Sequence, residues 1–370
     1  MPRLTCITTT FNDGPALLTS VRSVLNQSFE DFQYIIVDDG SAAETREILD
    51  GLQDDRLLVI RQANDGLSGA RNKALEQVRG DYVCFLDADD ARPTWAFAAI
   101  ADLIADQAPD VILTRGALCD LRGEILPFYD THVFHRIEAM IGAAPADLAD
   151  PQAVMVRRLA QLIEPQSANK VVRRELVGRG RAHFPNTHFF EDIQFHTAVL
   201  SAAERVSFLH QPAFTYFRRY QRPQITGSSS DMRFDIIPVT RLTLDAFSRT
   251  AQFRDPLWRG AVLASDESTH HPDHVGAVGL ALFLADAGDA VQIGQGFGLA
   301  AGNRAQRGVV EDHVGRQVVL ARHAGAPGLE RVQALALGQA QRLAVRGRGG
   351  AARAARACAT RACGLLADLA

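Results

Sequence analysis

The first third of the chain alternates short, continuous apolar runs with segments whose apolar residues recur at helical spacing. The apolar runs predict strands at Leu4–Thr10, Phe32–Val37, Leu57–Ile60, Tyr82–Leu86 and Val111–Leu113. The other segments predict helices: one marked by Leu17, Leu18, Val21, Val24 and Leu25, and others over Ala43–Leu52, Ser68–Val78 and Thr94–Asp106. Apolar strands separated by helices are typical of a parallel sheet covered on both faces. We therefore expect an α/β fold with a Rossmann-like, mostly parallel sheet.

Polar residues directly follow three of these predicted strands. They are Thr9–Asn12, Asp38–Ser41 and Asp87–Asp90. In an open parallel sheet, ligands bind outside the carboxyl ends of the strands, where the strand order reverses. The pattern therefore predicts that these three runs converge on one binding site.

The middle of the chain has a mixed pattern that continues the same domain. It predicts short strands at Glu124–Phe128, Val206–Leu209 and Ala213–Phe217, and a helix over Asp192–Ala202. We expect one domain over residues 1–250, with one half over about 1–117 and the other over about 118–250.

Residues 251–370 differ in composition, because they are rich in Ala, Gly and Arg and have weak apolar periodicity. We treat them as a poorly defined C-terminal extension, partly disordered by composition. The alternatives are a loosely folded appendage, a basic tail that faces a membrane, and translation of a GC-rich gene in a shifted frame.

Composition narrows the class of protein. The net charge of −4 gives no general attraction to nucleic acid, so none is expected as a partner. None of the five cysteines forms a CxxC pair, which favours free thiols in a reducing compartment. The N-terminus lacks the pattern of a signal peptide, and no apolar run is long enough to span a bilayer. We expect a cytoplasmic protein, with peripheral contact to the inner face of the membrane left open. The oligomeric state is not indicated.

The acidic run after Tyr82–Leu86 is the strongest chemical signal. Asp87, Asp89 and Asp90 repel one another unless a cation or hydrogen-bond donors compensate, and hard carboxylate oxygens suit Mg²⁺ or Mn²⁺. The alternative is a solvated acidic turn. The pair Asp38–Asp39 follows a second strand, with an Asx turn or helix N-cap as its alternative.

The segment Asn64–Asn72 joins a strand to a helix. Gly66 and Gly69 permit a tight turn, Ser68 suits a helix N-cap, and Arg71 would lie in the first turn, within reach of an anion. The alternative is a capped helix with a surface arginine. A later basic group is expected to form a solvated face, with binding of the diphosphate or of an anionic acceptor as its alternative; its members are Arg157, Arg158, Lys170, Arg173 and Arg174.

Four motifs, in this order, resemble the family 2 glycosyltransferases of the GT-A fold. They are Thr9–Asn12, Val37–Ser41, Gly66–Asn72 and Phe85–Asp90. The resemblance extends to Phe190-Glu191-Asp192, to Tyr216–Arg219 and to Ile225-Thr226, and covers about residues 3 to 230. It implies a GT-A fold, with a nucleotide-binding half over about 1–117 and an acceptor-side half over about 118–250, and a nucleotide-sugar donor.

The resemblance also implies individual residue roles on the donor side. Thr9 and Asp39 would contact the nucleotide base, Phe11 would lie near it, and Arg71 would line the nucleotide pocket.

Further roles follow around the reacting atoms. Asp87 and Asp89 would form the DxD motif, with Asp89 holding Mn²⁺ or Mg²⁺ on the diphosphate. Asp192 would be the general base for the acceptor hydroxyl, supported by Glu191.

The function implied is inverting transfer of a sugar from a nucleoside-diphosphate sugar, most simply a UDP-sugar, to a hydroxyl of a glycan or lipid-linked acceptor. Bacterial surface polysaccharide or lipopolysaccharide synthesis is the expected setting. One alternative is a nucleotidyltransferase, which needs a Gly-rich basic loop that Thr8–Gly14 does not provide. The other is a non-catalytic nucleotide- or glycan-binding module. The sequence does not specify the donor sugar, the acceptor or the linkage.

Overall fold

The structure is a computed structural model. It describes residues 3–147, 150–186, 189–218, 235–256 and 258–262, and the backbone of two strands at 307–311 and 317–321. The chain divides into two compact units, Met1–Gly276 and Ala277–Ala370. Most of the predicted C-terminal extension lies outside the described residues, and the predicted domain boundary at 250 stays a prediction.

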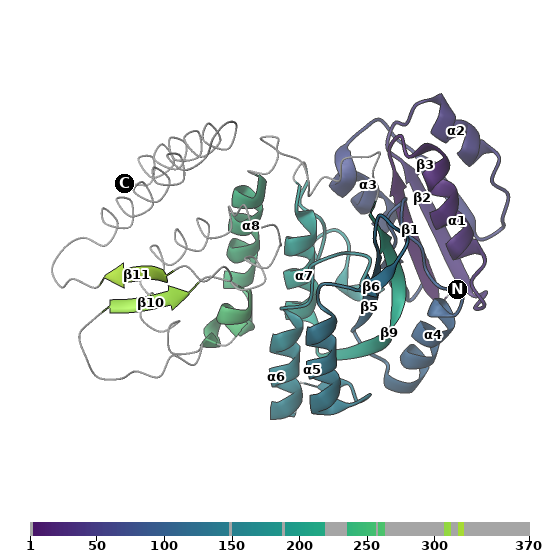
Figure 1. The fold of residues 1–370 in the computed structure, drawn as a ribbon. Helices are drawn as coiled ribbons and strands as arrows, with labels where there is room; N and C mark the ends of the chain where they lie inside the picture. Colours follow the sequence, from purple (N-terminus) through teal and green to yellow (C-terminus); the bar gives the residue numbers. More distant parts are fainter. Residues whose placement is uncertain are drawn as a thin grey trace, which may run out of the picture. The chain divides into compact units, whose positions relative to one another are not determined.

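A nine-stranded sheet organises the first unit (Figure 1). Its strands are β1 (Leu4–Thr10), β2 (Phe32–Asp38), β3 (Leu57–Arg61), β4 (Tyr82–Phe85), β5 (Val111–Cys119), β6 (Ile125–Pro127), β7 (Ala146–Asp147), β8 (Lys170–Arg173) and β9 (Arg205–Phe217). The order is β3-β2-β1-β4-β8-β5-β9-β7, and β6 pairs with β5 alone. The four strands β1 to β4 run parallel, whereas β8 is antiparallel to both of its neighbours.

Helices cover both faces of the sheet, as the alternating pattern predicts (Figure 1). They are α1 (Leu17–Leu25), α2 (Ala43–Asp50), α3 (Gly66–Leu75), α4 (Ala96–Gln107), α5 (Thr131–Ile141), α6 (Pro151–Ala160), α7 (Glu191–Ala202) and α8 (Ile236–Ser248). One apolar cluster joins the sheet to α1, α2 and α4, and the other joins it to α3, α5, α6 and α7. Helix α8 packs against α7.

The two apolar clusters arise because successive side chains of a strand point to opposite faces. Ile35 and Val37 of β2 belong to one cluster, and Tyr34 and Ile36 belong to the other. All residues of β2 and β4 are buried, which explains why these strands appear in the sequence as continuous apolar runs. The expected α/β fold with a flanked, Rossmann-like sheet is confirmed.

Strands β5 and β9 are longer than predicted, whereas β6 is shorter than the predicted strand Glu124–Phe128. The predicted strand Val111–Leu113 extends to Cys119, and two predicted strands merge into β9. Strands β5 and β9 pair in parallel over their whole shared length, with a register shift between Thr114 and Gly116. Both therefore continue past the level at which β4 ends.

The second unit contains a described antiparallel pair, β10 (Arg307–Glu311) with β11 (Gln317–Ala321). Within the described residues, no helix combines the length and apolarity needed to cross a lipid bilayer.

Candidate active site

The carboxyl ends of the parallel strands bring the predicted polar runs together. In register, Thr10 of β1 pairs with Asp38 of β2, and Ile7 pairs with Phe85 of β4. The backbone N–H of Asp39 also donates to the carbonyl of Thr10 at 2.9 Å. Three segments far apart in sequence therefore end at one edge of the sheet.

The two carboxylates after β2 have different surroundings. Asp38 is buried and accepts the backbone N–H of Ser41 at 2.8 Å, which is the Asx turn weighed as its alternative. Asp39 accepts the amide of Gln62 at 2.7 Å and the backbone N–H of Asp65 at 2.8 Å. Asp39 thus links β2 to the turn that opens α3.

The other two residues assigned to the nucleotide base lie on and just after β1. Thr9 is half-buried at the end of the strand, and Phe11 is 44% exposed. An aromatic ring at this edge that is open to solvent offers a flat surface for a ligand. Arg71, the fourth residue of this group, lies deeper.

Exposure alternates along the acidic run. Asp87 and Asp89 are half-buried, while Ala88 and Asp90 are buried. The carboxylate of Asp90 accepts the backbone N–H of Phe217 at 3.1 Å, which ties the run to the end of β9. Asp87 and Asp89 therefore face the site. Asp90, which sequence reasoning left without a function, anchors the acidic run to β9.

The acidic run fits a divalent cation that is shared with substrate. Among the described residues, no three His, Cys, Asp or Glu side chains cluster as a ready metal site. Mg²⁺ commonly binds only one or two carboxylates, with waters and substrate phosphates completing its shell. Asp87 and Asp89 provide hard oxygens of that kind, and neither is fully buried.

Helix α3 begins earlier than predicted. It starts at Gly66, whose φ of 77° suits glycine, after the cap residue Asp65. Ser68 is therefore inside the helix, where its hydroxyl is buried with no hydrogen-bond partner, and its assignment as N-cap is wrong. A Cβ at Gly69 would approach the side chain of Asp65 to 2.3 Å, so this position needs glycine.

Arg71 is the centre of the site. Its Nη1 donates to Glu191 Oε1 at 2.6 Å and to Asp192 Oδ1 at 2.8 Å, and its Nη2 donates to Asp87 Oδ1 at 2.9 Å. The side chain is only 2% exposed, so the alternative of a surface arginine is wrong. The guanidinium also lies 5.0 Å from the ring centre of Phe184. One buried cation thus connects the acidic run to the start of α7.

The acidic pair at the start of α7 follows a strained residue. Phe190 has a φ of 64°, in the left-handed region that few residues other than glycine adopt. The two carboxylates then differ in access: the side chain of Glu191 is 5% exposed and that of Asp192 is 25% exposed. A substrate can therefore reach the carboxylate of Asp192, whereas the carboxylate of Glu191 is buried.

Burial shifts the pKa of both carboxyls upward. Desolvation, followed by repulsion from Asp192, raises the pKa of Glu191 to about 8, against the lowering effect of Arg71. Desolvation also raises the pKa of Asp192, with Arg71 opposing the rise and Asp87 adding to it. One guanidinium does not fully compensate three carboxylates.

Sequence reasoning missed a buried polar network beside this pair. The Lys170 ammonium is fully buried, donates to Asn169 Oδ1 at 2.8 Å, and also hydrogen-bonds the carbonyl of Gln166. Desolvation lowers the pKa of Lys170 to about 7, while the charge of Asp192 opposes the shift. A backbone hydrogen bond from Ser167, in the same loop, lowers the pKa of Asp192.

The expected solvated basic face is therefore wrong for two of its members, because Lys170 and Arg157 are both buried. The sequence contains one indication that Lys170 differs from the other basic residues. Lys73 and Lys170 are the only lysines in a chain whose other basic residues are all arginine. The motif residues Arg219, Ile225 and Thr226 lie outside the described residues.

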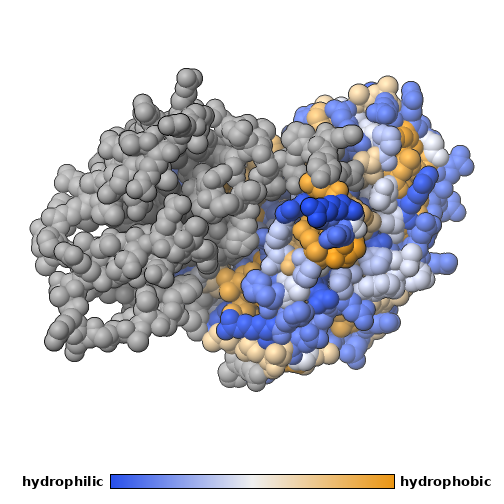
Figure 2. Space-filling model, viewed as in Figure 1, coloured by the Kyte–Doolittle hydropathy of each residue, from blue (hydrophilic) through white to orange (hydrophobic). Residues whose placement is uncertain are grey.

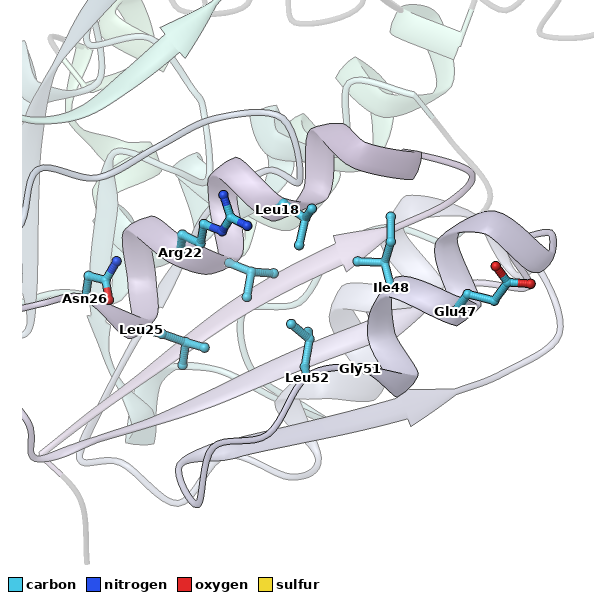
Figure 3. Close-up of a pocket in the computed structure, with 9 residues that line it drawn as sticks. Leu18, Arg22, Leu25, Asn26, Glu47, Ile48, Gly51 and Leu52 are labelled. Atoms are coloured by element: carbon cyan, nitrogen blue, oxygen red, sulfur yellow. The ribbon is translucent and has the colours of Figure 1, made fainter.

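A separate pocket of about 460 Å³ lies between α1 and α2 (Figure 3). Its lining is mainly aliphatic and includes Leu18, Leu25, Ile48 and Leu52. None of the predicted site residues contributes to it, so this pocket is separate from the predicted site at the sheet edge.

The comparisons with known proteins agree with this geometry. The model of glycosyl transferase family 2 matches residues 5–141. The putative glycosyltransferase EpsH of Bacillus subtilis (strain 168) is 27% identical over 234 residues, which are 60% of this chain and 64% of EpsH. The GalNAc(5)-diNAcBac-PP-undecaprenol beta-1,3-glucosyltransferase of Campylobacter jejuni is 38% identical over 94 residues, 24% of this chain and 30% of that protein. The chain thus spans less than two thirds of the length of each of these two relatives.

The similarity in structure extends further along the chain. The crystal structure of S. aureus TarS 1–349 in complex with UDP-GlcNAc aligns with a TM-score of 0.57 at 17% identity. The alignment covers 88% of this chain and 98% of that one. This likeness establishes the GT-A fold.

Proposed function

Because the chain belongs to glycosyl transferase family 2, we propose that it transfers a sugar from a nucleoside-diphosphate sugar to a hydroxyl group of a glycan or glycolipid. The observation that carries this proposal is the contact of Arg71 with Asp87 on one side and with Glu191 and Asp192 on the other. A donor held at the acidic run and an acceptor held at α7 would meet at this point.

The positions of the carboxylates support an inverting reaction. Asp192 takes the proton of the acceptor hydroxyl as its oxygen bonds to the anomeric carbon, while the bond from that carbon to the diphosphate breaks. A single in-line displacement inverts the anomeric centre and needs one base on the acceptor side. The raised pKa of Asp192 makes it a stronger base than an ordinary aspartate. Arg71 holds Asp192 in place through a direct hydrogen bond, and Glu191 accepts a hydrogen bond from the same guanidinium nitrogen.

The donor is proposed to lie along the sheet edge, with its base near Thr9, Phe11 and Asp39. TarS, which has the same fold, was crystallised in complex with UDP-GlcNAc, and we propose a UDP-sugar here. A cation held by Asp89 would supply positive charge to the departing diphosphate. We propose Mn²⁺ or Mg²⁺ because the available ligands are carboxylate oxygens.

The acceptor is proposed to be a glycan attached to a lipid, in bacterial surface polysaccharide or lipopolysaccharide synthesis. The C. jejuni relative is named for a substrate of that kind, GalNAc(5)-diNAcBac-PP-undecaprenol. A cytoplasmic location, at or near the inner face of the membrane, would suit such an acceptor.

The substitution Asp192→Asn tests the base. Asparagine has the same size and can still accept a hydrogen bond from Arg71, so UDP binding should stay within about twofold while transfer falls by about 10²- to 10⁴-fold. UDP binding is measured by calorimetry, and transfer by a panel of nucleotide sugars with bacterial lipid extracts as acceptors. Asp50→Asn is the control, because Asp50 is 63% exposed on α2. An active Asp192→Asn protein would remove Asp192 as the base.

The substitution Asp89→Ala tests the metal. It should abolish the gain in UDP affinity that Mn²⁺ gives the unaltered protein, because this carboxylate would hold the cation that supplies positive charge to the diphosphate. Calorimetric titration of UDP with Mn²⁺ and with a chelator measures the gain. If Asp89→Ala retains the full Mn²⁺ effect, the cation is held elsewhere.

A further inference from the structure

The connection between β5 and β6 is a tight hairpin that several hydrogen bonds stabilise. The backbone N–H of Asp120 donates to the carbonyl of Glu124 at 2.9 Å, and that of Gly123 donates to the carbonyl of Asp120 at 3.0 Å. The Asp120 carboxylate accepts the backbone N–H groups of Arg122 and Glu124 at 2.8 and 2.9 Å. Gly123 has a φ of 84°, which the turn requires. The residues on this hairpin are therefore held in fixed positions.

This hairpin and the residues just after it expose large apolar side chains. Ile125 is 64% exposed, Tyr129 41%, Leu121 40% and Leu126 39%. The only other large hydrophobic residues exposed among those described are Phe11 and Leu242. Figure 2 shows orange beside blue over the part of the face where Figure 1 labels β6. Such a concentration on one short segment marks an interaction surface.

Basic and amphipathic groups border the apolar side chains. Arg218 donates to the hydroxyl of Tyr129 at 2.6 Å, with its guanidinium 5.9 Å from the centre of that ring. Arg122 is exposed on the turn, and Glu124 is the exposed acid beside it. Aliphatic side chains, a tyrosine and arginines together suit the boundary between hydrocarbon and charged headgroups.

The hairpin lies at the substrate edge of the sheet. Leu113 is the last residue of β5 paired with β8, and β5 continues from there to Cys119. Ala91, next to the acidic run, bridges to Thr215 of β9, which is in register with Ala117 of β5. The β5–β6 hairpin therefore extends beyond the carboxyl end of β4, on the side where the acceptor must approach.

We propose that residues 120–129, the hairpin patch, dock on the surface of a lipid bilayer that carries anionic headgroups. Leu121, Ile125 and Leu126 enter the acyl boundary, Tyr129 lies at the headgroup level, and Arg122 and Arg218 meet lipid phosphates. This rests on the proposed function, since an enzyme whose acceptor sugar is attached to a lipid must bring its acceptor side to the membrane. The large apolar side chains of the patch are already exposed, which allows insertion without rearrangement of the fold.

Flotation of the full chain with vesicles of phosphatidylcholine and phosphatidylglycerol tests the proposal. The unaltered protein should float with the vesicles, and the double substitution Ile125→Ser, Leu126→Ser should lower the bound fraction at limiting lipid by about tenfold. The matched control is Leu242→Ser, because Leu242 on α8 is 39% exposed, as Leu126 is. All variants should keep the urea unfolding midpoint of the unaltered protein, because the changed side chains are exposed.

Each outcome of the flotation experiment either supports or overturns the proposal. Loss of flotation in the double variant but not in Leu242→Ser supports the proposal, even if another part of the chain also binds lipid. Failure of the unaltered protein to float, or equal flotation of the double variant, overturns it. A change in self-association on sedimentation without vesicle binding assigns the patch to a second copy of the chain and also overturns it. UDP binding is measured separately in solution, so loss of donor binding with flotation intact counts against the proposed function alone.

Discussion

At the scale of the residue, the main feature of the site is that a single arginine compensates the charges of several carboxylates. Arg71 carries one positive charge and contacts three carboxylates, two of them at the start of a helix. A buried carboxylate is costly without full compensation, and the deeper one, Glu191, bears most of that cost. A proton that is retained on Glu191 near neutral pH would restore the balance and leave Asp192 ionised as the base.

This balance predicts a pH dependence of stability. The pKa of Glu191 in the folded protein is about 8, above the ordinary glutamate value of about 4.3. The folded state thus binds this proton more tightly than the unfolded state, so the stabilisation is complete below about pH 4 and is lost as the pH rises through about 8. Glu191→Gln cannot ionise, and its free energy of unfolding should fall less between about pH 5 and pH 8 than that of the unaltered protein.

Urea unfolding at several pH values checks this prediction. Glu76→Gln is the control, because Glu76, which follows α3 directly, is 58% exposed and pairs with the exposed Lys73 of that helix. Identical pH dependence of Glu191→Gln and the unaltered protein would show that Glu191 is ionised throughout this range.

At the scale of the element, the acidic run and β9 support each other. The backbone of Ala91 exchanges hydrogen bonds with that of Thr215 at 3.2 and 2.7 Å, and Asp90 accepts the N–H of Phe217. Because Asp90 is 1% exposed, water cannot easily replace it at Phe217. The position of Asp87 and Asp89 therefore depends on a strand more than a hundred residues away in sequence.

The substitution Asp90→Ala should destabilise the fold by about 1–3 kcal/mol, because the partly buried N–H of Phe217 loses its acceptor. Asp90→Asn, which retains an acceptor oxygen, should cost less. Urea unfolding measures the stability, and hydrogen exchange of the Phe217 amide should accelerate in the alanine variant. Asp81→Ala is the exposed control. Equal stability of Asp90→Ala and Asp81→Ala would mean that this bond is not a significant support.

The same elements show how far the sequence can predict the fold and the site. Strands β1, β2 and β4 are predictable, because each is one short run of β-forming residues that is followed directly by the polar residues of the predicted site. The full length of β9 is not, because Gln211 and Pro212 interrupt the apolar pattern inside the strand. The burial of Arg71 and Lys170 is not predictable from local pattern either. Their partners, such as Asp192 for Arg71, come from distant segments that only the tertiary fold brings near.

At the scale of the whole molecule, the question is where the catalytic unit ends. Composition changes near residue 250, but the segment after it packs against helices α6 and α7. Gln252 donates to the carbonyl of Ser201 at 2.8 Å, and Asp255 forms an ion pair with Arg158. Trp258 is 2% exposed, with the guanidinium of Arg157 5.8 Å from its ring centre. These contacts belong to the compact unit Met1–Gly276.

Two truncated chains distinguish a domain boundary at residue 276 from one at residue 250. A chain of residues 1–276 should unfold cooperatively in urea and bind UDP as the full chain does, because it retains every contact described around the site. A chain of residues 1–250 lacks Trp258 and should be less stable by at least about 3 kcal/mol, since loss of a buried aromatic side chain leaves its packing surface open. Equal stability of the two truncated chains would place the boundary at residue 250, where the composition changes. If the longer chain also fails to unfold cooperatively, residues 277–370 are part of the same folding unit, and the catalytic half of the molecule is not independent of them.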